Sequence, residues 1–164
     1  MNVVKAVSTT IAVEHITLIS SQPFAQVRSR LEATLPKLDV RIVEHLVKGD
    51  ADKVKAYDDA GPALSIFLER DHGALLAIAG RRRNAIQYEI GNPLTASKMT
   101  RHNLSAALYA PLRVILYEND DGAAVFEYDR PSSLFGQFGD ARVTEVARSL
   151  DAHLEAALRV AAAA

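Results

Sequence analysis

Two strand-forming segments joined by a tight turn constrain the fold of this chain more than any other sequence feature. Residues 113–118 and 123–129 carry the β-branched and aromatic side chains typical of strands, and Asn119-Asp120-Asp121-Gly122 lies between them. The glycine supplies the positive φ that a short hairpin turn needs. Strands joined by a hairpin run antiparallel, so we expect an antiparallel sheet.

Three further segments have strand patterns. Residues 11–20 are rich in β-branched side chains, and residues 63–69 form a short apolar run typical of a buried strand. Residues 85–90 alternate, which places Ile86, Tyr88 and Ile90 on one face and the polar Gln87 and Glu89 on the other. The sequence therefore predicts a sheet of about five strands.

Helical patterns separate these strands. A first helix is expected to begin at Ser21 as N-cap and to end before Pro36, and two short helices to meet at Gly49 and Asp50 within residues 38–61. Residues 74–80 form a short helix or a strand, and the pattern favours the helix. Thr95 is a candidate cap for another helix, and residues 104–109 add a helical turn. Asp140 is expected to cap a long amphipathic helix that packs on the sheet.

Length and composition indicate one globular domain. The chain has 164 residues, 49% of them hydrophobic, which is enough to bury a core. We expect a single domain over residues 1–164, with flexible tails at about 1–9 and 160–164. Together with the strand and helix order, this predicts an α+β fold in which helices pack mainly on one face of an antiparallel sheet.

The charge balance and the absence of cysteine exclude several classes of function. Lysine plus arginine number 19 against 20 for aspartate plus glutamate, so we expect no binding to nucleic acid or to an anionic membrane. The absence of cysteine removes disulfides, thiolate metal sites and thiol nucleophiles. The first residues resemble neither a secretory signal nor a membrane anchor, and a cytoplasmic protein is expected.

Several phrases of the sequence together resemble the bacterial and archaeal family known as Domain of Unknown Function 302. They are PALSIFLERDHGALLA, YEIGNPLTASKM and ALYAPLRVILYENDDGAAVFEYDRPSSLFGQFGD, with the combination Asp71-His72, Gly91-Asn92-Pro93, Met99, Pro111-Leu112-Arg113 and Tyr128. The resemblance runs over roughly residues 13–158. It implies a strand, a helix, a four-stranded meander and a final helix, similar to half of a TATA-binding-protein-like unit with helical insertions. It implies no activity and no cofactor, and the shared architecture does not transfer DNA binding.

Asp71 and His72 form the most suggestive pair of titratable residues. A histidine beside a carboxylate can act as an acid, a base or a metal ligand, and this pair is the candidate catalytic site. The same residues can instead open a helix, with Asp71 as the N-cap. The turn Gly91-Asn92-Pro93 is a second candidate, with Asn92 as its ligand-binding residue, because small-molecule sites gather at strand ends, although it can also be purely structural.

The remaining candidates lie on strands or in turns. Arg113, at a strand start, and the basic run at 81–83 can bind an anion, but three basic residues are more often a solvated turn. Alternation can place some of Glu127, Tyr128 and Asp129 on the same open sheet face as His15, where a histidine with two carboxylates suffices for a zinc or acid–base site. No HExxH or HxH motif demands a metal site, and the scattered histidines favour solvated or core roles. Tyr128 completes the expected ligand-binding set of Asp71, His72, Asn92, Arg113 and Tyr128.

Three hypotheses of function follow. The first is a non-enzymatic domain that binds a small ligand or anion on the open sheet face or at the strand ends and forms a homodimer. The second is a metal-dependent or acid–base enzyme that uses His72 and Asp71. The third is an interaction module whose uncovered sheet face or edge strand pairs with another subunit. The sequence gives no support for a dinucleotide-binding protein or a nucleotide hydrolase, because neither G-x-G-x-x-G nor a P-loop is present.

Overall fold

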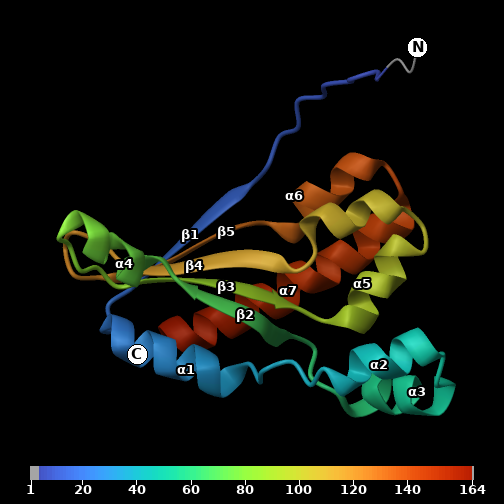
Figure 1. The fold of residues 1–164 in the computed structure, drawn as a ribbon, viewed down its shortest axis with the longest axis horizontal. Coiled ribbons are helices and arrows are strands. Elements are labelled where there is room, and N and C mark those ends of the chain that lie inside the picture. Colours follow the sequence, from blue (N-terminus) through green and yellow to red (C-terminus); the bar gives the residue numbers. More distant parts are fainter. Residues whose placement is uncertain (1–3, 164) are drawn as a thin grey trace.

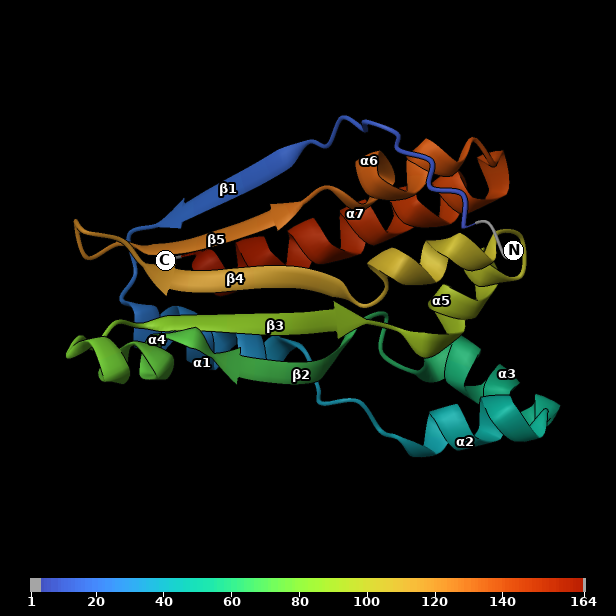
Figure 2. The same cartoon turned by 45° about the horizontal axis from the view of Figure 1, so that its top comes forward.

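The sheet contains the five antiparallel strands that the sequence predicts. The computed structural model describes residues 4–163 (Figure 1). The strands are β1 (His15–Ser20), β2 (Ser65–Asp71), β3 (Ala85–Gly91), β4 (Leu112–Glu118) and β5 (Ala124–Asp129). They lie in the order β1-β5-β4-β3-β2, so the first strand of the chain sits beside the last (Figure 2). This arrangement confirms the predicted α+β fold with an open antiparallel sheet.

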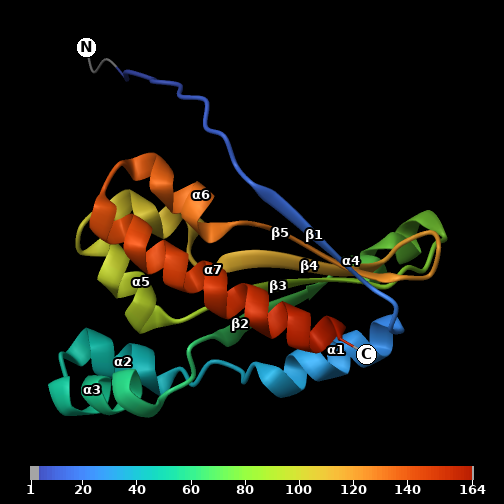
Figure 3. The same ribbon diagram turned by 180° about the vertical axis from the view of Figure 1, so that it is seen from behind.

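Residues 4–163 contain seven α-helices and three 3-10 segments, of which α6, η3 and α7 follow the last strand. The helices are α1 (Phe24–Thr34), α2 (Arg41–Lys48), α3 (Ala51–Ala60), α4 (His72–Leu75), α5 (Pro93–Thr100), α6 (Pro131–Phe135) and α7 (Ala141–Ala162). The 3-10 segments are η1 (Leu76–Ala79), η2 (Leu104–Tyr109) and η3 (Gly136–Phe138). The long helices α1 and α7 pack together on one face of the sheet (Figure 3). None of the helices within residues 4–163 has the length and apolarity to cross a membrane.

The core lies between the sheet and these two helices. Ile86, Tyr88 and Ile90 of β3 are buried, as their alternation predicts, and Gln87 and Glu89 lie on the opposite face. Helices α1 and α7 bury apolar side chains at helical spacing against this face. These side chains are Phe24, Val27, Leu31, Val143, Leu150, Leu154 and Leu158. Each large apolar side chain that is fully buried stabilises the fold by about 1.5–3 kcal/mol relative to exposure.

Several helix caps agree with the sequence, and two differ. Gly49 ends α2 with φ +69°, Asp50 caps α3, and Asp140 caps α7, as predicted. The expected cap at Ser21 is wrong: α1 has Pro23 at its N-cap position and no side-chain cap. The expected cap at Thr95 is also wrong, because α5 begins earlier and Asn92 caps it.

Two boundaries differ from the expected ones for reasons of packing. β1 begins at His15 rather than residue 11, because His15 pairs with Asp129, the last residue of β5, and α6 then starts at Pro131. Helix α7 continues into the expected tail as far as Ala162, with Ala161 fully buried. Residues 4–14 contain no helix or strand. Residues 1–3 and 164 of the expected tails lie outside the described residues.

Candidate functional site

The residues that the sequence singled out lie in separate parts of the sheet. Asp71 and His72 lie at the end of β2, next to the start of β3, whereas Asn92 follows the opposite end of β3. Arg113 lies on the open face, exposed and without an ion pair to another described residue. Tyr128 lies on the core face and is only 4% exposed, and burial raises its pKa. The structure does not bring these five residues together.

Asp71 and His72 form a helix entry. An Asp71 carboxylate oxygen accepts a hydrogen bond of 2.8 Å from the Ala74 amide and so caps α4. Gly73 is buried, and a Cβ there would lie 2.0 Å from the carbonyl oxygen of Arg83, so only glycine fits. The His72 side chain is exposed and forms no hydrogen bond with the described residues. The geometry favours the helix-entry reading over the enzyme reading for this pair.

A polar cluster on the open face joins β1, β4 and β5. His15 Nδ1 lies 2.9 Å from Asp129 Oδ1, His15 Nε2 lies 3.4 Å from Glu127 Oε2, and the Tyr117 hydroxyl donates to Glu127 at 2.6 Å. The hydrogen bond with Asp129 raises the pKa of His15, burial opposes this increase, and Glu127 adds to it. Strand alternation allowed some of Glu127, Tyr128 and Asp129 to lie beside His15, and the structure places Glu127 and Asp129 there but not Tyr128. Within residues 4–163, however, no group of such side chains has the geometry to hold a metal ion.

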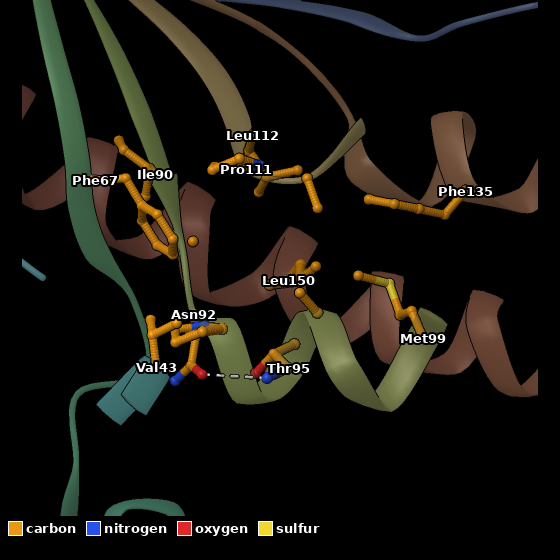
Figure 4. A pocket seen from close by; sticks show the side chains of 14 residues that line it. Val43, Phe67, Ile90, Asn92, Thr95, Met99, Pro111, Leu112, Phe135 and Leu150 are labelled. Atoms are coloured by element: carbon orange, nitrogen blue, oxygen red, sulfur yellow. Dashed lines mark hydrogen bonds between the residues drawn. The ribbon is translucent and has the colours of Figure 1, made fainter. Parts of the chain in front are cut away.

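A cavity with an almost entirely apolar lining lies where β3 ends and β4 begins. It has a volume of about 280 Å³ and lies among the sheet end, α2, α5, α6 and α7 (Figure 4). We call it the strand-end pocket. Its lining residues are Val43, Phe67, Ile90, Gly91, Asn92, Pro93, Thr95, Ala96, Met99, Ala110, Pro111, Leu112, Phe135 and Leu150.

Asn92 fixes the polar edge of the strand-end pocket. Its Oδ1 accepts hydrogen bonds from the amides of Leu94 and Thr95, at 2.9 and 3.1 Å, and its Nδ2 donates to the carbonyl of Pro62 at 3.0 Å. These bonds hold the first turn of α5 against the segment that enters β2. Figure 4 shows the Asn92 side chain beside Thr95 at one edge of the pocket, with the apolar side chains beyond.

Backbone features of β2 and β3 shape the opposite wall. The pairing of these strands is irregular between Ile66 and Leu68, which places the Phe67 ring beside the end of β3. At Gly91, an added Cβ would lie 3.5 Å from this ring and 3.6 Å from the Pro111 side chain. The absence of a side chain at Gly91 therefore leaves the space between Phe67 and Pro111 open.

The chemistry of the strand-end pocket favours neutral, apolar ligands. None of its fourteen lining residues has an ionisable side chain, and only Asn92 and Thr95 contribute polar side-chain atoms. An anion would lose its hydration there without meeting a cation, which is costly. A set of residues for nucleophilic or acid–base catalysis is also missing from the lining. The arrangement can bind and enclose a ligand.

Sequence reasoning found only one of the pocket residues as a site residue. Asn92 was predicted from its place at a strand end, whereas Phe135 and Met99 are 0% and 1% exposed and have the sequence signature of ordinary core residues. Met99 and the Pro111-Leu112 pair did belong to the family resemblance. That co-occurrence was the one available signal, since apolar residues that line a cavity and those that fill a core have the same chemistry.

Comparisons with known proteins support the fold and give no activity. A family model described as "Domain of unknown function DUF302" matches residues 60–161, from the end of α3 to near the end of α7. A solved structure, "Crystal structure of uncharacterized conserved protein DUF302 from Bacillus stearothermophilus", is 19% identical, with a TM-score of 0.65. The alignment covers 89% of this chain and 96% of that chain. No curated protein matches.

Proposed function

Because the chain belongs to the family described as domain of unknown function DUF302, which supplies no activity, we propose from the geometry that it binds a small, neutral, mainly apolar molecule in the strand-end pocket. The single observation that supports this function is the pocket itself, a cavity of about 280 Å³ with an almost entirely apolar lining. Binding sites for small molecules are typically concave and apolar with a few placed polar groups. Asn92 and Thr95 supply such groups here.

The size of the cavity limits the ligand. A dry apolar cavity of on the order of 150 Å³ is large enough to bind benzene. The strand-end pocket, at about 280 Å³, therefore suits a molecule of one or two rings or a short branched chain. It is slightly smaller than the range of roughly 300–1,000 Å³ that is usual for larger ligands.

A thermal-shift titration with indole and toluene as probes tests this function. A probe present at 100 times its Kd stabilises the folded state by about 2.7 kcal/mol, which raises the melting temperature by several degrees. Benzoate, which adds a charge to a ring of similar size, is expected to give a much smaller shift because the lining offers it no cation. If indole, toluene and a wider set of neutral aromatic and aliphatic probes all leave the melting temperature unchanged, the proposed function is wrong.

A filled pocket provides the matched control. Ala96 lines the cavity, and Ala96→Leu places three more carbon atoms in it, so this variant should lose the shift with indole. Ala152→Leu makes the same change on the exposed side of α7 and should keep the shift. Circular dichroism confirms that both variants are folded. Equal probe shifts in A96L and A152L would place the binding elsewhere.

A further inference from the structure

The segment before β1 has the sequence of a strand but pairs with nothing in the described chain. We call residues 6–12 the N-terminal arm. Val7, Thr9 and Ile11 alternate along it and are all β-branched, a residue type that favours strands. The arm extends away from the body of the molecule, and Val7 is 79% exposed (Figures 1 and 3). Its backbone donors and acceptors are therefore open to a partner.

The outer edge of β1 is open as well. Within residues 4–163, β1 pairs with β5 alone. The Glu14 carbonyl accepts a hydrogen bond from the Arg130 amide at 2.8 Å, and the Glu14 amide donates to Ser133 Oγ at 3.0 Å, so Glu14 directs its backbone groups toward β5 and α6. Alternate residues of a strand direct these groups to opposite sides. Residues 15, 17 and 19 therefore direct theirs outward, away from the sheet.

We propose that the arm of one molecule adds to the outer edge of β1 in a second copy, antiparallel, and that the exchange is reciprocal. A two-fold axis through Val13, perpendicular to the sheet, is consistent with this pairing, because two identical strands then meet with the same faces aligned. The axis places Val7 opposite Ile19 of the second copy, Thr9 opposite Thr17, and Ile11 opposite His15. Addition of an extended segment to a sheet edge is a common mode of recognition.

The side chains in this register are complementary. Ile19 is 69% exposed on the open face and would be covered by Val7 of the second copy. The two threonines face each other, a pair that stabilises antiparallel strands. The arm carries no charged residue, so no like charges meet across the new pairing.

The opposite edge of the sheet is a poorer target for the arm. The backbone of Ile66 in β2 already donates to the Pro36 carbonyl and accepts from the Leu38 amide, both at 2.9 Å. The segment around Lys37 thus covers the start of that edge. The free edge of β1, together with the arm that continues it, favours a second copy of this chain as the occupant.

Two proline variants test the pairing itself. By the same alternation, the Thr9 amide faces the partner and the Thr10 amide faces solvent. Proline has no N–H and is tolerated on an edge strand only where that group is not needed. Thr9→Pro should therefore weaken the dimer by roughly tenfold or more, because the lost hydrogen bond occurs twice in the symmetric interface. Thr10→Pro restricts the backbone in the same way, but the dissociation constant of its dimer should stay close to that of the unsubstituted chain.

Light scattering and sedimentation equilibrium at 1–100 µM give the readout. Within this range, the unsubstituted chain should show twice its mass of 17.8 kDa. T10P should show the same mass at each concentration, whereas T9P should show a mass closer to that of the monomer. A monomer throughout the range for the unsubstituted chain overturns the proposal. Equal dissociation constants for T9P and T10P overturn it too, since an interface elsewhere would not distinguish the two positions.

Cross-linking locates the axis. The chain has no cysteine, so Val13→Cys introduces a single thiol, and the proposed axis brings two copies of it to backbone positions about 5.5 Å apart. A short bismaleimide should join V13C into a covalent dimer, whereas Ser149→Cys, on the exposed side of α7, should remain uncross-linked. A dimer by mass in which V13C does not cross-link would overturn the arm exchange. Neither result depends on occupation of the strand-end pocket.

Discussion

His15 lies between two carboxylates of the neighbouring strand, and its charge determines how strongly β1 is held to β5 by side chains. The hydrogen bond with Asp129 raises its pKa above the ordinary value of 6.5. A histidine whose pKa is raised by folding stabilises the folded state fully below its unfolded pKa, and this contribution disappears as pH rises through the folded pKa. The imidazole is 55% exposed, so solvent screens the effect to less than about 1 kcal/mol.

We therefore predict that the free energy of unfolding decreases slightly as pH rises from 6 through 8, and that His15→Gln removes this part of the dependence. Denaturant titrations at several pH values measure the difference between the two proteins, which cancels the contributions of the other four histidines. An NMR titration should place the pKa of His15 above 6.5. Parallel pH profiles for the two proteins would contradict the prediction.

Tyr88 is a buried aromatic residue whose hydroxyl donates a hydrogen bond to the ion pair of Arg28 and Glu32 at the edge of the core. Its hydroxyl donates to Glu32 Oε1 at 3.0 Å, and Arg28 Nε donates to the same oxygen at 2.8 Å. Burial and this carboxylate both raise the pKa of Tyr88. Burial alone would raise the pKa of Glu32, but the hydrogen bonds from Arg28 and Tyr88 outweigh it and lower that pKa.

Tyr88→Phe should lower the free energy of unfolding by about 1.5 kcal/mol, near the lower limit for a hydrogen bond to a charged group because Glu32 is partly solvated. Tyr117→Phe provides the control: it removes a hydrogen bond of the same type to Glu127 on the open face, where water can replace it. In urea unfolding, we expect Y117F to lower the free energy of unfolding by less than Y88F does. The reverse order would show that the buried hydroxyl contributes little.

At the scale of secondary-structure elements, helix ends could be predicted where a single residue determines them. Gly49, Asp50 and Asp140 mark helix ends by their own conformation or side-chain oxygen, and each was found from sequence. The sequence indicates a turn at Gly91-Asn92-Pro93 and a cap at Thr95, whereas Asn92 itself caps α5. Asparagine before proline is also a favourable helix start, since proline at the first position needs no hydrogen-bond partner.

The end of α7 gives an element-scale prediction. Ala161 is fully buried, and the carbonyl of Ala162 accepts a hydrogen bond of 2.7 Å from Ser20 at the end of β1. Ala161→Glu buries a carboxylate or frays this turn, so we expect a loss of roughly 2–4 kcal/mol. Val160→Glu, one residue earlier at a position 59% exposed, should cost less than about 1 kcal/mol. Equal costs in thermal unfolding would mean that this end behaves as the tail that the sequence suggested.

At the scale of the whole molecule, the two-layer architecture could be predicted, but the pocket could not. Alternation in β3 and the apolar stripe of α7 each specify a buried face, and two such faces must meet. The strand-end pocket depends instead on distances among several elements that are remote in sequence. Phe67, Pro111 and Leu150 line one pocket only because the fold places the sheet end beside α7. No pattern of residue spacing along the chain predicts that these three side chains lie together.

The pairing of the first strand with the last has a consequence for the order of folding during synthesis. His15 contacts Asp129 across 114 residues of chain, and α1 packs against α7, which follows all five strands in the sequence. Contacts this distant in sequence cost loop entropy and slow folding. During synthesis, β1 and the apolar face of α1 therefore remain without their partners until β5 and α7 have been made. A nascent chain of this protein completes its core only after α7 has left the exit tunnel.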